Sequence, residues 1–286
     1  MAKYIHLFDT DEEFQAMYND DEKYIEPWAS YTRETESCDY NKPNPLATPF
    51  TIEMLEDGQI STYPPSISYS LNGGAWVDVG QGEALSISLS SGDTVSFKGN
   101  SGVMFSWAIT GAYNVYGNFM SLVCGDDFAT ATTLPQDLHY FVEMLAHTSV
   151  VSAENLLLPA TTLADRCYYQ MFYDCTSLTT APTILPATTL AENCYDGMFA
   201  GCTSLTTAPA LPATTLAPYC YSYMFQGCTS LNSITCLATD ISAEGCTEEW
   251  VSGVASTGTF TKAASMSSWT TGVNGIPNGW TVVPAQ

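Results

Sequence analysis

The chain has 286 residues, of which 45% are apolar, so it is long enough to bury more than one hydrophobic core and is not disordered throughout. Its 30 acidic residues against 7 basic residues give a formal net charge of -23, which repels phosphate backbones and anionic membrane surfaces and disfavours nucleic acid as a partner. No stretch approaches the roughly 18 apolar residues of a membrane helix. No apolar secretory segment opens the sequence, so we expect neither membrane insertion nor export by the usual route.

Residues 1–45 form an acidic N-terminal segment that carries amphipathic aromatic side chains. Thr10 and Glu13 have the spacing of a helix capping box, which predicts a short helix after Asp9. Such a helix is too short to be stable alone, so we expect this segment to dock onto another surface. The residues expected to make the docking contact are Phe14, Met17, Tyr18, Trp28 and Tyr31.

Residues 46–125 are predicted to form a small antiparallel β-sandwich. Apolar residues alternate with serine over residues 85–90, which predicts a strand with one buried face. Asn72-Gly73-Gly74 and Ser91-Gly92-Asp93 have the composition of hairpin turns.

From about residue 131 the sequence repeats itself, and residues 126–260 are predicted to form a solenoid. The run LPATTLA begins at Leu158, Leu185 and Leu211, and each copy continues as CYxxMFxxCTSL. A degenerate copy begins at Leu237, and residues 140–159 look like a degenerate first copy. A regular array with irregular ends is typical of coils that bury their apolar faces against one another.

The positions that are identical in every copy are expected to form buried columns along this solenoid. One column consists of Met171, Met198 and Met224, and a second consists of Phe172, Phe199 and Phe225. Residues 261–286 are expected to add a C-terminal strand or tail.

The repeat pattern resembles the BspA-like class of leucine-rich repeats, in which the run Ile-Gly-x-x-Ala-Phe-x-x-Cys-x-x-Leu precedes a short strand. The corresponding residues of the third copy are Cys220, Met224, Phe225, Cys228 and Leu231. The resemblance covers roughly residues 131–257 and implies a short strand and a short helix in each coil of 26 to 27 residues. Tyrosine replaces the Gly of the family run, which leaves the geometry of that turn open.

No pattern of catalytic or metal-ligating residues stands out. Seven of the ten cysteines fall in two periodic columns without a CxxC pair, so we expect them to be reduced, buried thiols; disulfides between coils are the less favoured alternative. His6, His139 and His147 belong to no nucleophile–base or HExxH pattern. We therefore expect no enzymatic activity, metal or cofactor, and a hydrolase with carboxylates far apart in the sequence remains the alternative.

The variable positions of the repeat indicate one candidate binding surface. Positions that differ between copies are expected to face solvent, and those that follow each Cys-Tyr pair are rich in aromatic and amide side chains. Such a surface can contact glycans or protein loops, and an ordinary polar flank is the alternative. The candidate ligand-binding residues are Tyr168, Tyr169, Gln170, Tyr173, Tyr195, Asp196, Tyr221, Tyr223 and Gln226.

The overall layout is similar to that of surface proteins of bacteriophages that infect gut Bacteroidales, including the stretches HLFDTDEEFQAMYND and YIEPWASYT. This resemblance implies a virion surface protein, either a head or tail fibre or a decoration subunit, that is made in the host cytoplasm and forms a homo-oligomer. Residues 1–45 would then bind other capsid or tail proteins, and the repeats would meet a host-surface glycan or protein. The alternative is a bacterial cell-surface adhesin with BspA-like repeats.

Overall fold

The computed structural model of the protein is rich in β-strands, and its helical elements are short. It describes residues 45–63, 66–99, 107–134, 141–267 and 269–285. The helical elements within these ranges are η2 (Pro45–Ala47), α3 (Ser121–Cys124) and η3 (Gly125–Thr130). The predicted docking residues Phe14, Met17, Tyr18, Trp28 and Tyr31 lie outside the described residues, so the docking role of residues 1–45 stays a prediction.

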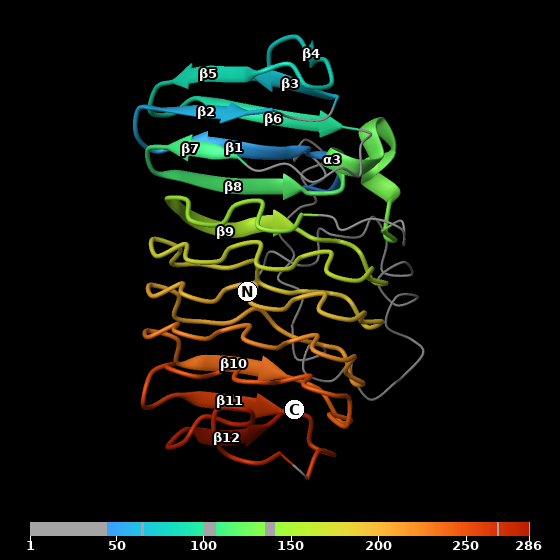
Figure 1. Ribbon diagram of the computed structural model, residues 1–286, viewed down its shortest axis with the longest axis vertical. Helices are drawn as coiled ribbons and strands as arrows, with labels where there is room; N and C mark the ends of the chain where they lie inside the picture. Colours follow the sequence, from blue (N-terminus) through green and yellow to red (C-terminus); the bar gives the residue numbers. More distant parts are fainter. Residues whose placement is uncertain (1–44, 64–65, 100–106, 135–140, 268, 286) are drawn as a thin grey trace, which may run out of the picture.

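Eight strands form a unit at one end of the molecule that we call the two-sheet module (residues 50–118; Figure 1). They are β1 (Phe50–Met54), β2 (Gly58–Thr62), β3 (Ile67–Leu71), β4 (Val77–Val79), β5 (Leu85–Leu89), β6 (Thr94–Gly99), β7 (Ala108–Thr110) and β8 (Tyr113–Asn118). Their pairings with one another are antiparallel, as the alternating sequence predicted. One sheet has the order β4-β3-β6-β1-β8-β9, in which β9 (Val150–Leu157) comes from outside the module, and the other has the order β5-β2-β7.

The period-two pattern of the sequence supplies the core of this module. In β5 the side chains of Leu85, Ile87 and Leu89 are buried, and the serines between them are exposed. These leucines and isoleucine join one cluster with Phe50 and Phe97, which come from the other sheet. Alternation over a few residues thus places one face of each strand in a shared apolar interior.

Strand pairing continues from the two-sheet module into the repeats. Strand β9 (Val150–Leu157) lies parallel to β8, and the N–H of Phe119 donates to the carbonyl of Leu157 with an N···O distance of 3.0 Å. On its other side β9 forms a parallel bridge from Ser152 to Thr180 in the first full repeat copy. The predicted boundary at residue 125 is therefore not marked by an interruption of the sheet.

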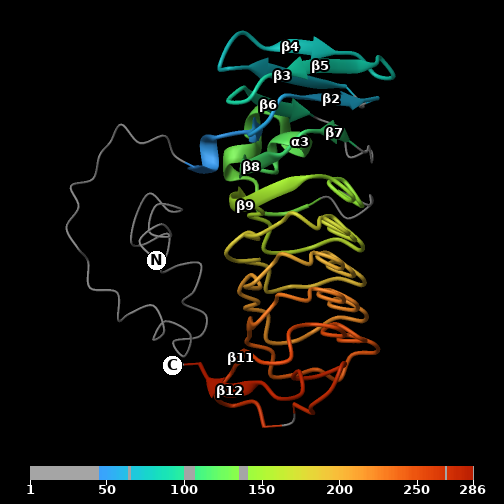
Figure 2. The same cartoon turned by 90° about the vertical axis from the view of Figure 1, so that its left-hand side faces the viewer.

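Successive copies of the repeat lie on one another over residues 141–285, which we call the repeat stack (Figure 2). Parallel bridges join equivalent positions, for example Thr162 to Thr189 and Thr207 to Ser233. At the C-terminal end the bridges lengthen into a parallel sheet. Its strands are β10 (Ser233–Cys236), β11 (Thr259–Lys262) and β12 (Thr281–Pro284), in that order.

The segment that contains each CYxxMF run is a series of turns, so the short helix that the resemblance implied is wrong. In the first full copy Arg166, Gln170 and Asp174 adopt φ values of 56°, 52° and 56°. A left-handed residue at every fourth position interrupts the repeated right-handed geometry that an α-helix needs. No α-helix occurs in residues 141–267 or 269–285.

Backbone hydrogen bonds of this turn segment alternate between two kinds of partner. The N–H groups of Tyr168 and Gln170 donate to carbonyls of the next copy, at N···O distances of 3.0 and 2.9 Å. The N–H group of the intervening Tyr169 donates to Arg166, three residues back in its own copy, at 3.3 Å. Half of the backbone N–H groups of the turn segment therefore donate to the next copy, and these hydrogen bonds satisfy buried backbone groups without a helix.

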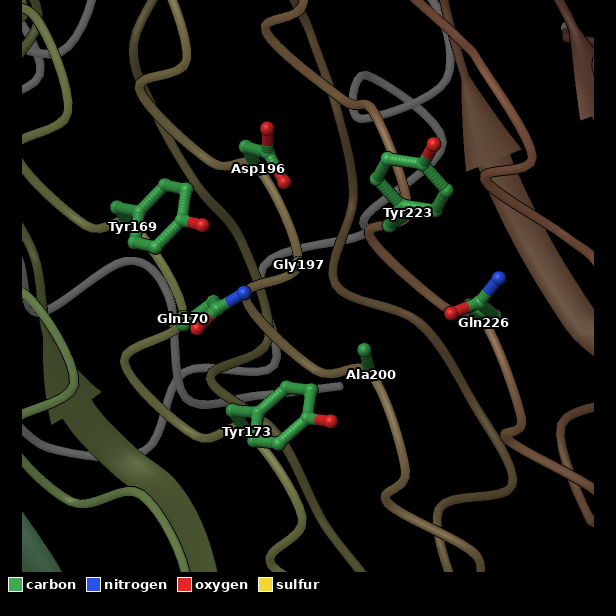
Figure 3. Close-up of a pocket in the computed structure, with 8 residues that line it drawn as sticks. All are labelled: Tyr169, Gln170, Tyr173, Asp196, Gly197, Ala200, Tyr223 and Gln226. Carbon is green, nitrogen blue, oxygen red and sulfur yellow. The ribbon is translucent and has the colours of Figure 1, made fainter.

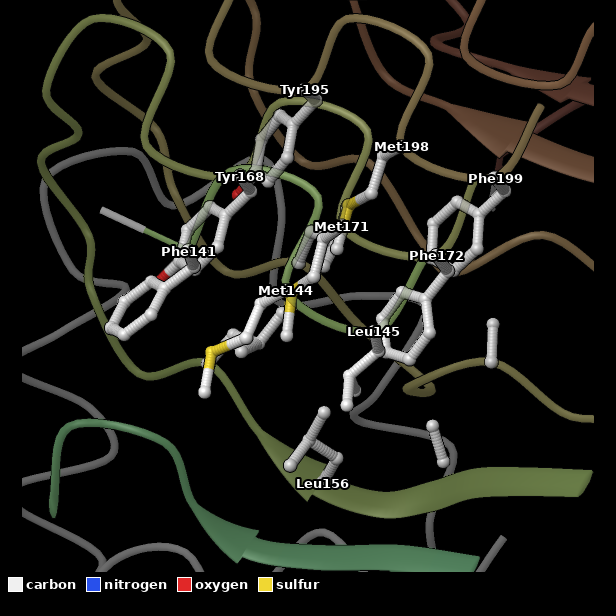
Figure 4. Packing of buried hydrophobic residues seen from close by; sticks show 14 of the residues in the cluster. Phe141, Met144, Leu145, Leu156, Tyr168, Met171, Phe172, Tyr195, Met198 and Phe199 are labelled. Atoms are coloured by element: carbon white, nitrogen blue, oxygen red, sulfur yellow. The ribbon is translucent and has the colours of Figure 1, made fainter. Parts of the chain in front are cut away.

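The predicted columns of methionine and phenylalanine are confirmed. Met171, Met198 and Met224 are fully buried, as are the three equivalent phenylalanines. The ring of Phe199 is stacked on that of Phe172 with a centroid distance of 5.4 Å (Figure 4). On its other side it is stacked on Phe225 at 5.8 Å. The repeat stack is thus held by apolar side chains in register, in addition to the hydrogen bonds between copies.

The cysteines of the repeat are buried free thiols, as expected. The Sγ atoms of Cys175, Cys202 and Cys228 each donate to a backbone carbonyl of the preceding copy at 3.0 to 3.1 Å. Burial raises the pKa of Cys175 to about 11 and that of Cys228 to about 12, so these thiols keep the proton that they donate.

Candidate functional site

A hollow of about 310 Å³ lies on the flank of the repeat stack (Figure 3). Its lining comes from equivalent positions of the three full repeat copies, in the turn segment that follows each cysteine. The lining residues are Tyr169, Gln170, Tyr173, Asp196, Gly197, Ala200, Tyr223 and Gln226. Six of these are candidate residues of the sequence analysis, and the structure brings them together.

The hollow exists because the middle copy carries small residues between two copies with large ones. Gly197 occupies the position of Gln170 in the copy before and of Tyr223 in the copy after. Ala200 likewise lies between Tyr173 and Gln226. A Cβ atom on Gly197 would lie 2.9 Å from the Gln170 side chain, so the space is already limited on that side. Gly197 and Ala200 are variable positions of the repeat that were not among the predicted ligand-binding residues, although their small size in this position was the available signal.

Asp196 supplies the charged group of the hollow. The residue is 9% exposed, and no donor in the described part of the chain hydrogen-bonds to its carboxylate. Burial raises the pKa of Asp196 to about 6, with the guanidinium of Arg166 acting in the opposite direction and the carboxylate of Glu248 adding to the increase. At neutral pH the group is therefore largely an ionised acceptor that has lost much of its water.

Neighbouring side chains fix the remaining polar groups at the rim. Gln226 donates its Nε2 hydrogen to Oε2 of Glu249 at 2.9 Å, which leaves its carbonyl oxygen as an acceptor. The ring of Tyr173 meets that of His147 edge-to-face at 5.2 Å. His147 Nδ1 in turn lies 3.2 Å from Oδ2 of Asp174. The rim is thus positioned by contacts between successive copies.

Two tyrosines of the hollow have altered acidity. Burial raises the pKa of Tyr169, and the Asp196 carboxylate adds to the effect. The carboxylate of Glu248 is the main cause of the raised pKa of Tyr223. Both phenols therefore keep their protons near neutral pH and can donate hydrogen bonds.

The three tyrosines that directly follow the first cysteine of each copy are not part of this surface. Tyr168, Tyr195 and Tyr221 are 1% exposed, and their rings stack at centroid distances of 5.6 and 6.0 Å. Burial also raises their pKa values well above the ordinary one. Their prediction as ligand-binding residues is wrong, because side chains that are identical in every copy form the interior column.

This column runs beyond the repeats at both ends. Phe141 stacks on Tyr168 at 5.6 Å and meets Phe119 of the preceding segment at 4.5 Å. At the other end Tyr221 is followed by Trp250 at 6.3 Å. An unbroken series of contacting aromatic rings therefore runs from Phe119, just after β8, to Trp250 in the C-terminal coils.

The described residues contain no cluster of three or more histidine, cysteine or acidic side chains that could hold a metal ion. Within the same residues, no helix has the length and apolar content to cross a membrane. Comparison with protein-family models, with curated proteins and with solved structures finds no match to the chain.

Proposed function

We propose that this chain is a non-enzymatic recognition protein of a bacteriophage virion, a fibre or decoration subunit, in which the repeat stack is a BspA-like leucine-rich-repeat solenoid. In this proposal the hollow over the three full copies recognises host-surface material. A β-sandwich formed by residues 46–125 separates the solenoid from the docking segment, residues 1–45.

The observation that carries the recognition role is the contrast between the interior and the flank of the same three copies. Interior positions carry the same residue in each copy, as Met171, Met198 and Met224 do. At the hollow the copies differ in a way that opens space, and this space contains a carboxylate that lacks a partner among the described residues. A purely structural spacer has no need of a carboxylate that has lost part of its water, because this loss disfavours the charged form.

The virion assignment is supported by the layout of the sequence, with an acidic aromatic segment ahead of a β-rich module and repeats. Residues 1–45 would bind a capsid or tail protein, and several copies of the chain would assemble on one particle. The excess of acidic over basic residues in residues 1–45 favours a polar or basic socket for the docking segment.

The recognition role is tested by substituting the flank without changing the interior. The variant Tyr169→Ala/Gln170→Ala/Tyr223→Ala should still enter particles but lose attachment to isolated host-surface material. Its melting transition should stay close to that of the parent, because surface substitutions usually change stability by no more than about 0.5 kcal/mol each. Undiminished attachment of the folded variant would contradict the proposal.

The virion role is tested by deleting residues 1–45 and by mass spectrometry of purified particles. The truncated chain should fold but be absent from virions, whereas the full chain should be present. Detection of the full chain on the surface of uninfected bacteria, and not in virions, would favour the alternative of a bacterial adhesin.

A further inference from the structure

We propose that the hollow binds one neutral pyranose ring of a glycan, through hydrogen bonds from the sugar hydroxyls to Asp196 and from the amide of Gln170 to the sugar. This inference rests on the proposed function and specifies the ligand of the same site. Size, hydrogen-bonding groups and charge each support it.

The size of the hollow matches a single ring. Ligand sites for small molecules usually enclose about 300 to 1,000 Å³, and the hollow measures about 310 Å³. Large side chains close it on both sides, with Tyr169 and Tyr173 from one copy and Tyr223 and Gln226 from the other. An extended segment of several residues would have to lie outside these side chains.

The polar groups of the hollow are complementary to vicinal hydroxyl groups. A sugar hydroxyl donates one hydrogen bond and accepts others, so it needs acceptors and donors side by side. The two oxygens of the Asp196 carboxylate can each accept such a bond; the residue is 9% exposed, and no group of the described residues donates a hydrogen bond to the carboxylate. The amide of Gln170 points toward the middle copy, as do the hydroxyl groups of Tyr169 and Tyr173 (Figure 3).

The charge around the hollow excludes an anionic sugar. The exposed carboxylates of Glu143, Glu248 and Glu249 lie on the same columns of the stack as the lining residues. Arg166 is the basic residue that acts on Asp196, and its effect is smaller than that of burial. A sialic or uronic acid would therefore meet net repulsion.

A quaternary ammonium group is the competing ligand for a site with three tyrosines and a carboxylate. Such cations are bound over the faces of aromatic rings. Here Tyr169 and Tyr173 turn their hydroxyl groups, not their ring faces, toward the middle copy (Figure 3). This orientation favours a ligand that forms hydrogen bonds.

The test uses saturation-transfer NMR on the full chain with the methyl glycosides of glucose, galactose, mannose and N-acetylglucosamine. At least one of these should give signals from the parent protein that change little between low and high salt, because a neutral ligand is not screened. Ala200→Tyr should reduce the signals at least tenfold. The stack should accept this tyrosine, because Tyr173 and Gln226 occupy the same column; Ala200→Gln provides a second, smaller obstruction.

Thr206→Tyr is the matched control, since Thr206 is exposed on the same copy and does not line the hollow. Glycosides should give the same signals with Thr206→Tyr as with the parent. Asp196→Asn should weaken glycoside binding without altering the fold.

Three results would overturn the inference: no signal from any of the four glycosides, undiminished signals in folded Ala200→Tyr and Ala200→Gln, or choline binding that decreases steeply with salt in place of glycoside binding.

Failure of the ligand assignment and failure of the proposed function give different results. If Ala200→Tyr loses attachment to host-surface material but the parent binds no glycoside, the recognition role stands and the sugar assignment is wrong. If the parent binds a glycoside at the hollow but particles lack the chain, the sugar site stands and the virion role is wrong.

Discussion

The two-sheet module and the repeat stack reach a buried core by different routes. In the module, β1 pairs with β6 and β8 in antiparallel ladders, and side chains alternate between the core and solvent. In the stack, the turn segments donate every second N–H to the next copy, and identical side chains lie above one another. Each strand of the module therefore has its own partners, whereas each copy of the stack depends on its equivalent in the next one.

The difference also appears in how the two regions use left-handed backbone. In the module such a residue is usually glycine, as at Gly117, where φ is 83° and an added Cβ would lie 2.1 Å from the carbonyl oxygen of Pro49. In the stack the same conformation is shared along a column, with Asp174 at φ 56° beside Gly201 at φ 78°. The stack thus stabilises a conformation that costs an isolated non-glycine residue about 1 to 2 kcal/mol.

The largest expected effect comes from removing one ring of the stack. Phe199→Ala should lower the free energy of unfolding by about 3 to 5 kcal/mol, because the ring is fully buried between Phe172 and Phe225 in the middle copy. Chemical denaturation measures this loss. A change below about 1 kcal/mol would mean that the copies do not depend on one another in the way described.

An intermediate loss of stability is expected from substituting glycines with left-handed backbone, and it should be larger in the two-sheet module than in the repeat stack. Gly117→Ala should destabilise the protein by about 2 to 4 kcal/mol, since both the backbone conformation and the carbonyl of Pro49 oppose the new Cβ. Gly201→Asn should cost only about 1 kcal/mol, because Asp174 already holds this conformation in the neighbouring copy and the added Cβ would approach Asp174 no closer than 3.1 Å. Thermal unfolding of both variants gives the comparison, and equal losses would remove the distinction between the regions.

The smallest expected effect is the pH dependence that Asp196 gives to the stack. Its pKa is about 6 in the folded chain against 3.8 for an ordinary aspartate, so the folded state binds more protons between these values. Stability should therefore fall as pH rises from about 4 to about 6, by about 1 to 2 kcal/mol for a partly solvated group. Unfolding of the parent and of Asp196→Asn across this range isolates the effect, because other carboxylates cancel in the difference. Parallel profiles would show that Asp196 is not desolvated.

The sequence predicted the elements whose signal is either alternation or repetition. The serines of residues 85–90 revealed β5, and the repeated Met-Phe pairs revealed the two interior columns. The turn segments were missed because Gln170 carries no sign of left-handed backbone, which the glycines at equivalent positions of later copies, Gly197, Gly201 and Gly227, reveal. Comparison between copies was therefore more informative than the residues of any single copy.

The candidate site was predicted in part, for the same reason. Variable positions such as Tyr169, Asp196 and Tyr223 line the hollow, as positions that face away from the interior should. Tyr168 was assigned to the surface because it adjoins the variable positions, but its identity in all copies pointed to the interior. The parallel pairing of β8 with β9 had no signal in the sequence, since register between a unique strand and a repeat depends on the three-dimensional arrangement.

The parallel pairing of β8 with β9 has a consequence for how the chain acquires its structure during synthesis. An array of coils lacks a stable starting unit, because the first coil has nothing on which to form. Here β8 offers a preformed edge, and β9 is the first repeat strand to leave the ribosome after it. When each later coil is synthesised, the preceding coil on its N-terminal side is already folded and offers an edge for pairing, so folding can proceed in the order of translation. The two-sheet module would serve as the nucleus for the repeats, and its loss would slow their folding even if every repeat copy were intact.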